Sequence, residues 1–357
     1  MTLLTETDRF SNWLNYRNSP CVVAGPCSVE SEEQILGTAK ELVRCGATLL
    51  RGGIWKPRTS PGSFEGVGEK GLSWLKAAGQ VVGLPVATEV ATPSHVERCL
   101  AAGIDVLWIG ARTTTSPIAV QEIANALAGV DIPVMIKNPM SPELKLWIGA
   151  IERMRRAGVV RVVAVHRGFS THIRHQYRYQ PLWRIPLELR REMPTIPILC
   201  DPSHISGERR FVPEVAQKAM RLGFDGLMVE SHWRPESALS DRGQQLSPTQ
   251  LAKLIEAASR IFCHCDEQSL GRWEEIDEID QDLRSLLMRR MAILQDAREG
   301  QRGDSTSGWM AIHAARFLAG LLALLIRSAT PRSGMDSSRY THIEAGTEEP
   351  ARLGISS

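Results

Sequence analysis

Short runs of apolar and β-branched residues alternate with longer amphipathic stretches from Cys21 to about Phe262. The short runs have the length and composition of buried strands, and the longer ones have helical periodicity. Eight repeats of this unit are present. The predicted strands are Cys21 to Ala24, Thr48 to Leu50, Pro85 to Thr88, Val106 to Ile109, Pro133 to Ile136, Val160 to Val165, Ile196 to Leu199 and Gly226 to Val229.

The stretches between these runs predict helices, several of which are followed by glycine. Ser31 to Gln34 has the sequence of a capping box, in which a serine and a glutamine satisfy backbone N–H groups at the first turn. The predicted helices include Ser31 to Cys45, Pro93 to Ala102, Ser116 to Ala128, Pro142 to Ala157 and Pro213 to Leu222.

Eight consecutive strand and helix units predict an α/β protein with a closed (β/α)8 TIM barrel. An open, doubly wound sheet is the alternative. It is disfavoured because the first strand is not followed by a Gly-x-Gly-x-x-Gly turn. The glycine-rich segment Gly62 to Gly71 also lacks the spacing of a phosphate-binding P-loop.

The pattern changes near Cys263 to Gly271. Beyond it, Ile276, Ile279 and Leu283 lie on one helical stripe, and after Ile326 the chain is polar with little periodicity. We therefore predict three parts: a barrel in residues 1–262, a small helical appendage in residues 263–300, and a largely disordered tail in residues 301–357.

The composition favours a small ligand. The formal net charge of +2 provides no global field for nucleic acid or a membrane surface. Seven irregularly spaced cysteines and the absence of an apolar leader favour a reducing, cytoplasmic location. The longest apolar run, Phe317 to Ile326, is far shorter than the roughly 20 residues of a membrane span.

Four potential metal ligands lie at or shortly after predicted strands: Cys27, His204, Glu230 and Asp241. Each alone is more simply a packing or loop residue. Together they form a mixed sulfur, nitrogen and oxygen set that suits Mn, Fe, Co or Zn better than Mg or Ca.

Six cations also follow strand ends, where the active site of such a barrel is built. The alternative interpretation is that these cations are ordinary solvated residues at the rim of the barrel, paired with acids. Convergence on one mouth instead predicts a ligand set with several negative charges, because the cations would otherwise repel one another. They are Arg51, Lys56, Arg58, Arg112, Lys137 and Arg167.

Seven ordered motifs carry a family resemblance over residues 20–262: Ala-Gly-Pro-Cys-Ser, Leu-Arg-Gly-Gly, Lys-Pro-Arg-Thr-Ser, Ile-Gly-Ala-Arg, His-Arg-Gly, Asp-Pro-Ser-His and Val-Glu-Ser-His. This set resembles 3-deoxy-D-arabino-heptulosonate 7-phosphate (DAHP) synthase. The resemblance is greatest to the group related to 3-deoxy-octulosonate 8-phosphate synthase, especially versions with a C-terminal chorismate mutase.

The resemblance implies a metal-dependent condensation of phosphoenolpyruvate (PEP) with erythrose 4-phosphate, the first step of the shikimate pathway, by a dimer or tetramer. It places Arg112 and Arg167 on the PEP phosphate, and Arg51 and Lys137 on its carboxylate. It implies that Lys56 faces the aldehyde and transfers protons, with the metal ligands Cys27 and His204 also serving catalysis, and that Arg58 and Thr59 bind the erythrose phosphate.

Two alternatives stay open at this point: an octulosonate synthase that uses arabinose 5-phosphate, and a non-catalytic barrel that binds phosphorylated metabolites. The segment Lys56 to Ser60 favours DAHP synthase over the octulosonate synthase, because octulosonate enzymes typically have Lys-Ala-Asn-Arg there. Asn138 departs from the arginine common in DAHP synthases, although Lys-Asn-Pro resembles the mutase-fused subgroup.

The appendage resembles the first helix of an all-helical chorismate mutase, with Arg290 as the arginine that reaches a substrate carboxylate. An arginine at a helix edge is an equally good reading. The remaining mutase motifs are missing, so we expect impaired mutase activity, through a frameshift or deletion near residues 292–303 or through conversion to a regulatory or dimerising module.

Overall fold

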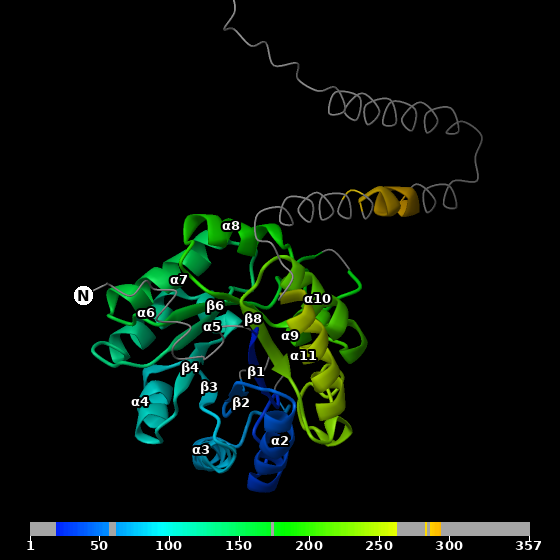
Figure 1. The fold of residues 1–357 in the computed structure, drawn as a ribbon. Coiled ribbons are helices and arrows are strands. Elements are labelled where there is room, and N and C mark those ends of the chain that lie inside the picture. Colours follow the sequence, from blue (N-terminus) through cyan, green and yellow to red (C-terminus); the bar gives the residue numbers. More distant parts are fainter. Residues whose placement is uncertain (1–18, 57–61, 173–174, 263–282, 284–285, 294–357) are drawn as a thin grey trace, which may run out of the picture. The chain divides into compact units, whose positions relative to one another are not determined.

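The chain folds into a closed barrel of eight parallel strands surrounded by helices (Figure 1). The computed structural model describes residues 19–56, 62–172, 175–262, 283 and 286–293. Each strand pairs with the next along the chain, and β8 closes the barrel by pairing with β1. The strands are β1 (Cys21–Gly25), β2 (Leu49–Arg51), β3 (Val86–Val90), β4 (Val106–Ile109), β5 (Val134–Lys137), β6 (Val162–His166), β7 (Ile198–Cys200) and β8 (Gly226–Glu230).

All eight predicted runs form strands, so the predicted barrel is confirmed and the open-sheet alternative is wrong. The five predicted helices are also present, with ends that shift by one or two residues. The helices are α2 (Glu32–Arg44), α3 (Lys70–Val82), α4 (Pro93–Ala101), α5 (Ala111–Thr114), α6 (Pro117–Ala126), α7 (Leu144–Arg156), α8 (Arg184–Glu192), α9 (Pro202–Ser206), α10 (Val212–Arg221) and α11 (Pro248–Phe262).

The start of α2 is a variant of the predicted capping box. The Ser31 hydroxyl accepts the backbone N–H of Gln34 at 3.1 Å. The Gln34 side chain accepts the N–H of Glu30 at 3.2 Å, where a reciprocal box would use that of Ser31. Gln34 also donates to the Ser28 carbonyl, so it secures the β1–α2 loop that carries Cys27.

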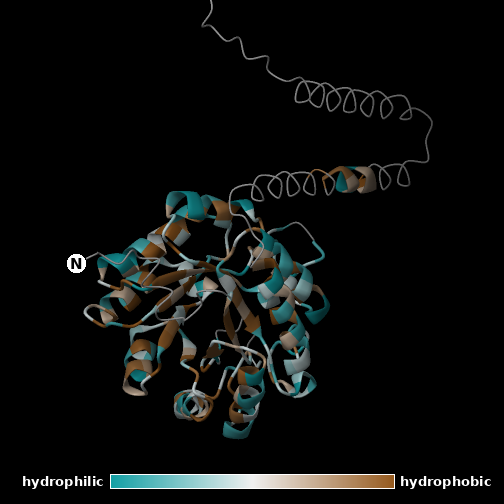
Figure 2. Ribbon diagram, in the orientation of Figure 1, coloured by the Kyte–Doolittle hydropathy of each residue, from teal (hydrophilic) through white to brown (hydrophobic). Residues whose placement is uncertain are grey.

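Side chains along the strands alternate between the barrel interior and the layer beneath the helices. Figure 2 shows the resulting hydrophobic strands at the centre of the barrel. Trp108 is the largest interior side chain and is fully buried. The interior apolar layer consists of Cys21, Val23, Leu49, Ala87, Val106, Trp108, Met135, Val163, Val165, Leu199 and Met228.

A carboxylate at the amino end of the barrel joins neighbouring strands. Asp105, immediately before β4, accepts the N–H of Val86 at 2.9 Å and pairs with Lys76 at 2.8 Å. Its position, opposite the strand ends where the site is expected, marks it as a purely structural aspartate.

The chain separates into two compact units, Met1–Arg284 and Ser285–Ser357. In the second unit, residues 286–293 are helical and Arg290 is partly buried. The predicted boundary at 262/263 and the tail at 301–357 lie largely outside the described residues and stay predictions. Among the described residues, no helix is both long and apolar enough to cross a membrane.

His166, the last residue of β6, faces the helix layer and is fully buried among aromatic rings. Its ring centroid lies 5.1 Å from that of Trp183 and 5.7 Å from that of Phe169. Neither ring nitrogen has a hydrogen-bond partner among the described residues. Burial, reinforced by Arg167, lowers the pKa of His166 to about 3.

Replacing His166 with leucine should reduce the acid sensitivity of the fold. Because the folded pKa of about 3 lies below the ordinary histidine pKa of 6.5, the unfolded chain binds the additional proton as pH falls between these values. The wild type should therefore lose about 2 kcal/mol of unfolding free energy through this group between pH 7 and pH 5. Urea denaturation of both metal-free proteins at the two pH values measures this, and equal losses would contradict it.

Candidate active site

Charged side chains occupy the interior position directly above the apolar layer on six of the eight strands. Each stands two residues after an interior apolar residue, so the strand alternation points it into the mouth of the barrel. The six residues are Arg51, Glu89, Lys137, Arg167, Asp201 and Glu230.

The predicted cations therefore converge, but acids stand among them, which corrects the expectation of an uncompensated cationic mouth. Arg51 donates to Glu230 at 3.2 Å, and Lys137 donates to Asp201 at 2.6 Å. All four side chains are buried. Asp201 and Glu89 were not predicted as site residues, although both could have been found by counting two positions from the interior residues Leu199 and Ala87.

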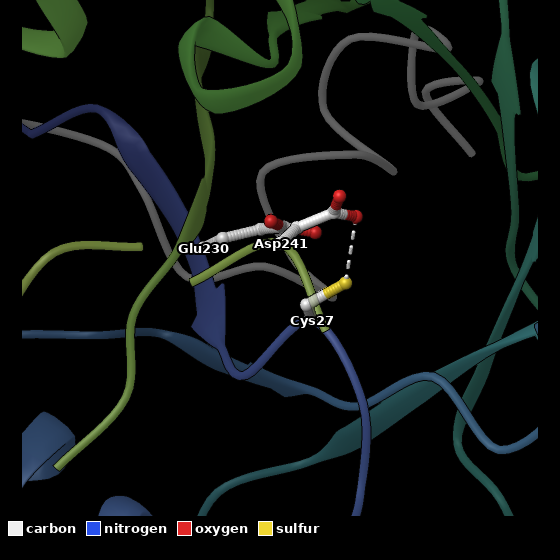
Figure 3. A group of neighbouring side chains, drawn as sticks. All are labelled: Cys27, Glu230 and Asp241. Carbon is white, nitrogen blue, oxygen red and sulfur yellow. Dashed lines mark hydrogen bonds between the residues drawn. The ribbon is translucent and has the colours of Figure 1, made fainter. Parts of the chain in front are cut away.

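Three of the four predicted metal ligands gather into one group. The ligand atoms of Cys27, Glu230 and Asp241 all lie within 4.8 Å of one another. They come from the β1–α2 loop, the end of β8 and the loop before α11, and Cys27 Sγ lies 3.2 Å from an Asp241 oxygen (Figure 3). Segments far apart in the sequence thus meet at one point.

The fourth ligand, His204 of α9, lies beside this group. Its Nε2 is 3.6 Å from Glu230 Oε1, and its Nδ1 is 2.8 Å from Asp201 Oδ2. A metal-binding histidine typically has its second nitrogen on a carboxylate, and Asp201 lies at the distance for this role, although the direction of Nδ1 does not meet hydrogen-bond geometry. The donor set and its surroundings therefore fit a divalent cation of the softer, transition-metal type.

The electrostatics of the group also suit a cation. Burial and the neighbouring Glu230 carboxylate raise the pKa of Cys27 to about 12. Burial acts in the same direction on Glu230, but His204 and Arg51 hold the pKa of that carboxyl below its ordinary value. A bound cation would stabilise the thiolate that the protein alone disfavours.

Lys56 closes one side of the group, with its Nζ 3.1 Å from Cys27 Sγ. Burial opposes the charge of Lys56, but the charges of Cys27 and Glu230 raise its pKa above the ordinary value. Lys56 is therefore held as an ammonium next to the candidate metal ligands. The predicted residues Arg58 and Thr59 lie outside the described part of the chain.

Two buried glutamines hold the loop that carries Asp241. Gln245 accepts the N–H of Cys27 at 3.0 Å and donates to the Ser240 carbonyl at 2.8 Å. Gln244 donates to Glu230 at 2.8 Å. Asp241 itself adopts a positive φ of 44°, a conformation uncommon for residues other than glycine. Sequence reasoning missed both glutamines, because uncharged loop residues give no signal of their tertiary partners.

Two buried cations, Arg51 and Lys137, lie next to the candidate metal group. Arg51 Nε and Nη1 are buried without hydrogen-bond partners among the described residues. The Arg51 guanidinium and the Lys137 ammonium lie 4.9 and 6.0 Å from the Trp108 ring. Burial and the like charge of Arg51 lower the pKa of Lys137, although Asp201 opposes this shift.

Arg167 is positioned by an aromatic ring and an amide. Its guanidinium stacks 3.6 Å above the ring centroid of Tyr179, and its backbone N–H donates to Asn138 at 2.7 Å. Asn138 also donates to the Gly168 carbonyl, so its departure from the family pattern has a structural use here. Arg112, in α5, is exposed at the same end of the barrel. Tyr179 was not predicted.

Arg178 connects this region to the candidate metal group. It donates to Asp241 at 3.3 Å and to Gln244 at 3.1 Å. Although burial opposes its charge, Asp241 raises the pKa of Arg178 above the ordinary value. Sequence reasoning missed this residue, because the long β6–α8 segment contains many arginines and gives no spacing signal.

The fold and the site define an enzyme of the (β/α)8-barrel class, with an anion-binding mouth beside a candidate metal group. The chain belongs to the DAHP synthetase I family, whose sequence profile matches residues 12–263. It is thus an enzyme of PEP-condensing aldol chemistry.

The curated relatives include enzymes with two different names. The phospho-2-dehydro-3-deoxyheptonate aldolase of Thermotoga maritima is 32% identical over 240 residues, which cover 67% of this chain and 69% of that protein. The 2-dehydro-3-deoxyphosphooctonate aldolase of Legionella pneumophila is 29% identical over 267 residues, which cover 68% of this chain and 92% of that protein.

Solved structures confirm the fold. The crystal structure of the T. maritima DAHP synthase superposes with a TM-score of 0.62 at 31% identity, covering 69% of this chain and 70% of that one. A truncated form of that enzyme gives a TM-score of 0.60 at 28% identity, covering 69% and 87%. The family match ends at residue 263, so the mutase-like reading of residues 263–300 stays a prediction.

Replacing Gln245 with leucine should destabilise the protein by about 2–4 kcal/mol, because the Cys27 N–H and the Ser240 carbonyl would both lose their buried partner. Thermal and urea unfolding measure the change. The same substitution at the exposed Gln250, which accepts only the N–H of Ser247, is the matched control and should change stability by less than about 1 kcal/mol. Equal losses in the two variants would contradict the role of Gln245 in holding the loop that carries Asp241.

Proposed function

We propose that the protein is a metal-dependent DAHP synthase, which condenses PEP with erythrose 4-phosphate and water to give DAHP and inorganic phosphate. The observation that carries the proposal is the Arg51 guanidinium, whose buried Nε and Nη1 have no hydrogen-bond partner within the described part of the chain. A buried donor without a partner is unfavourable, and a planar carboxylate satisfies two guanidinium N–H groups at once.

The cations divide the proposed PEP site into two ends. Arg51 and Lys137, buried in the barrel interior, would hold the carboxylate. Arg167, stacked on Tyr179, and Arg112 on α5 would hold the phosphate. PEP carries negative charge at both ends, so this division orients C3 as well as binding the molecule.

Cys27, His204, Glu230 and Asp241 would hold the divalent ion, of which the set suits Mn, Fe, Co or Zn. When bound, such an ion acts as a Lewis acid that polarises the aldehyde or activates a water. Lys56, an ammonium beside Cys27, would face the aldehyde and supply a proton to its oxygen. C3 of PEP attacks the aldehyde carbon, water adds at C2, and phosphate leaves.

The second candidate is the octulosonate synthase, which is supported by the Legionella relative at 29% identity. Pro57, Arg58 and Thr59 after Lys56 favour erythrose 4-phosphate. The presence of the whole layer of charged residues disfavours a non-catalytic barrel. We also propose that mutase activity is impaired in the appendage, which contains the partly buried Arg290.

The deciding assay follows phosphate release from PEP with erythrose 4-phosphate or arabinose 5-phosphate, each in the presence of EDTA or of added Mn²⁺. Of the two sugars, we expect only erythrose 4-phosphate to support turnover with PEP. This turnover should be lost in EDTA and recovered with Mn²⁺. A preference for arabinose 5-phosphate would establish the octulosonate reaction instead. Absence of turnover with either sugar in folded, metal-loaded protein would overturn both assignments.

Replacing Arg167 with lysine should raise KM for PEP tenfold or more, with a smaller effect on kcat, since lysine loses both the bidentate fork and the stack on Tyr179. Steady-state kinetics at saturating sugar measure this. The same substitution at Arg161, which pairs with Asp131 ahead of β6, is the control and should leave KM unchanged. An unchanged KM in the Arg167 variant would remove Arg167 from the PEP site.

A further inference from the structure

Asp201 is a fully buried carboxylate with three contacts. One oxygen, Oδ1, accepts the backbone N–H of His204 at 3.1 Å and so caps the short helix α9. The other, Oδ2, lies 2.6 Å from Lys137 Nζ and 2.8 Å from His204 Nδ1. A single oxygen therefore faces both a cation of the proposed PEP site and a ligand of the proposed metal site.

We propose that Asp201 is a positioning residue that prepares His204 for the metal and links metal binding to PEP binding through Lys137. This inference rests on the proposed function, because it assumes that both sites are used. It assigns a role to a residue that touches neither the ion nor the substrate.

The first part of the role is the choice of imidazole tautomer. His204 Nδ1 lies 2.8 Å from Asp201 Oδ2, although its direction does not meet hydrogen-bond geometry with any of the described residues. Because an ionised carboxylate only accepts hydrogen bonds, its charge at this distance favours the tautomer with the proton on Nδ1. Nε2 then keeps its lone pair and points it toward Glu230 Oε1, 3.6 Å away, beside the candidate metal group. Without the carboxylate, the tautomer with a proton on Nε2 becomes accessible, and that tautomer cannot bind a cation.

The second part of the role follows from the sharing of Oδ2. When Nε2 of an imidazole binds a cation through its lone pair, the Nδ1–H group becomes a stronger hydrogen-bond donor. Its interaction with Asp201 Oδ2 then becomes stronger. The hold of Asp201 on Lys137 weakens accordingly, and the ammonium becomes more available to a substrate carboxylate. Metal should therefore tighten PEP binding, and by linkage PEP should tighten metal binding by the same factor.

Asp105 shows what the same group does in a purely structural setting. It also accepts one backbone N–H and one lysine, at 2.9 and 2.8 Å, but at the amino end of the barrel. Within the described residues, the Asp105 carboxylate bonds to the Val86 N–H and to Lys76, and to no histidine. Asp105 is thus a matched control, since its loss removes similar bonds and leaves the proposed sites intact.

The test measures Mn²⁺ binding to the full-length chain after EDTA treatment, by electron paramagnetic resonance of free Mn²⁺, for wild type, Asp201→Asn and Asp105→Asn. We expect Asp201→Asn to raise the Kd for Mn²⁺ 10- to 100-fold. Asp105→Asn should leave it within about twofold of wild type. Circular dichroism verifies that each variant is folded.

Binding of PEP to the same proteins separates positioning from damage to the structure. A structural lesion would weaken both ligands. Removal of the charge that competes for Lys137 should instead leave the Kd for PEP in metal-free Asp201→Asn equal to or below that of wild type. The several-fold tightening of PEP by Mn²⁺ expected in wild type should disappear in this variant.

A second variant covers the case in which Asp201→Asn does not fold. Lys137→Met leaves Asp201 wholly to His204, so it should bind Mn²⁺ at least as tightly as wild type while binding PEP more weakly. Weaker Mn²⁺ binding by Lys137→Met, or an unchanged Kd for Mn²⁺ in Asp201→Asn, would overturn the inference. Failure of the wild type to bind Mn²⁺ would instead refute the metal site of the proposed function.

Discussion

Opposite charges removed from water at the mouth of the barrel determine how the rest of the site is built. Arg51 pairs with Glu230, and Lys137 with Asp201, with all four side chains buried. Such pairs add little net stability, because the loss of hydration offsets their attraction. Their use lies in preorganisation: donors and acceptors are held in place before a ligand arrives, with no solvent to reorganise.

The loop that carries Asp241 is held in place next to this charged layer by backbone conformation and by hydrogen bonds. Asp241 adopts a positive φ, which is one place where backbone strain of about 1–3 kcal/mol is stored. Gln244, Gln245 and Arg178 supply the hydrogen bonds that keep the segment in place. Neutral amides suit this task, since they satisfy buried backbone groups without adding charge next to the candidate ligands.

The barrel could be predicted because buried parallel strands leave continuous apolar runs, and eight such runs remained visible without tertiary information. Cys27, Glu230, Arg51 and Lys137 could be singled out as candidates because a charge or thiol at a strand end contrasts with its surroundings, and the structure brings them to one end of the barrel. Glu89 and Asp201 escaped notice because a single acid at the end of a strand also suits a turn or a helix cap. The cited partners of Gln244 and Tyr179 lie more than ten residues away along the chain, which no local pattern encodes.

Trp108 fills the barrel interior beneath the charged mouth. Its indole fills the interior just beneath Arg51 and Lys137, and it is itself fully buried. The packed layer of Val106, Met135 and their neighbours continues below it. The barrel interior is therefore closed beneath the charged layer, so whatever binds at the mouth enters and leaves from the same end of the barrel.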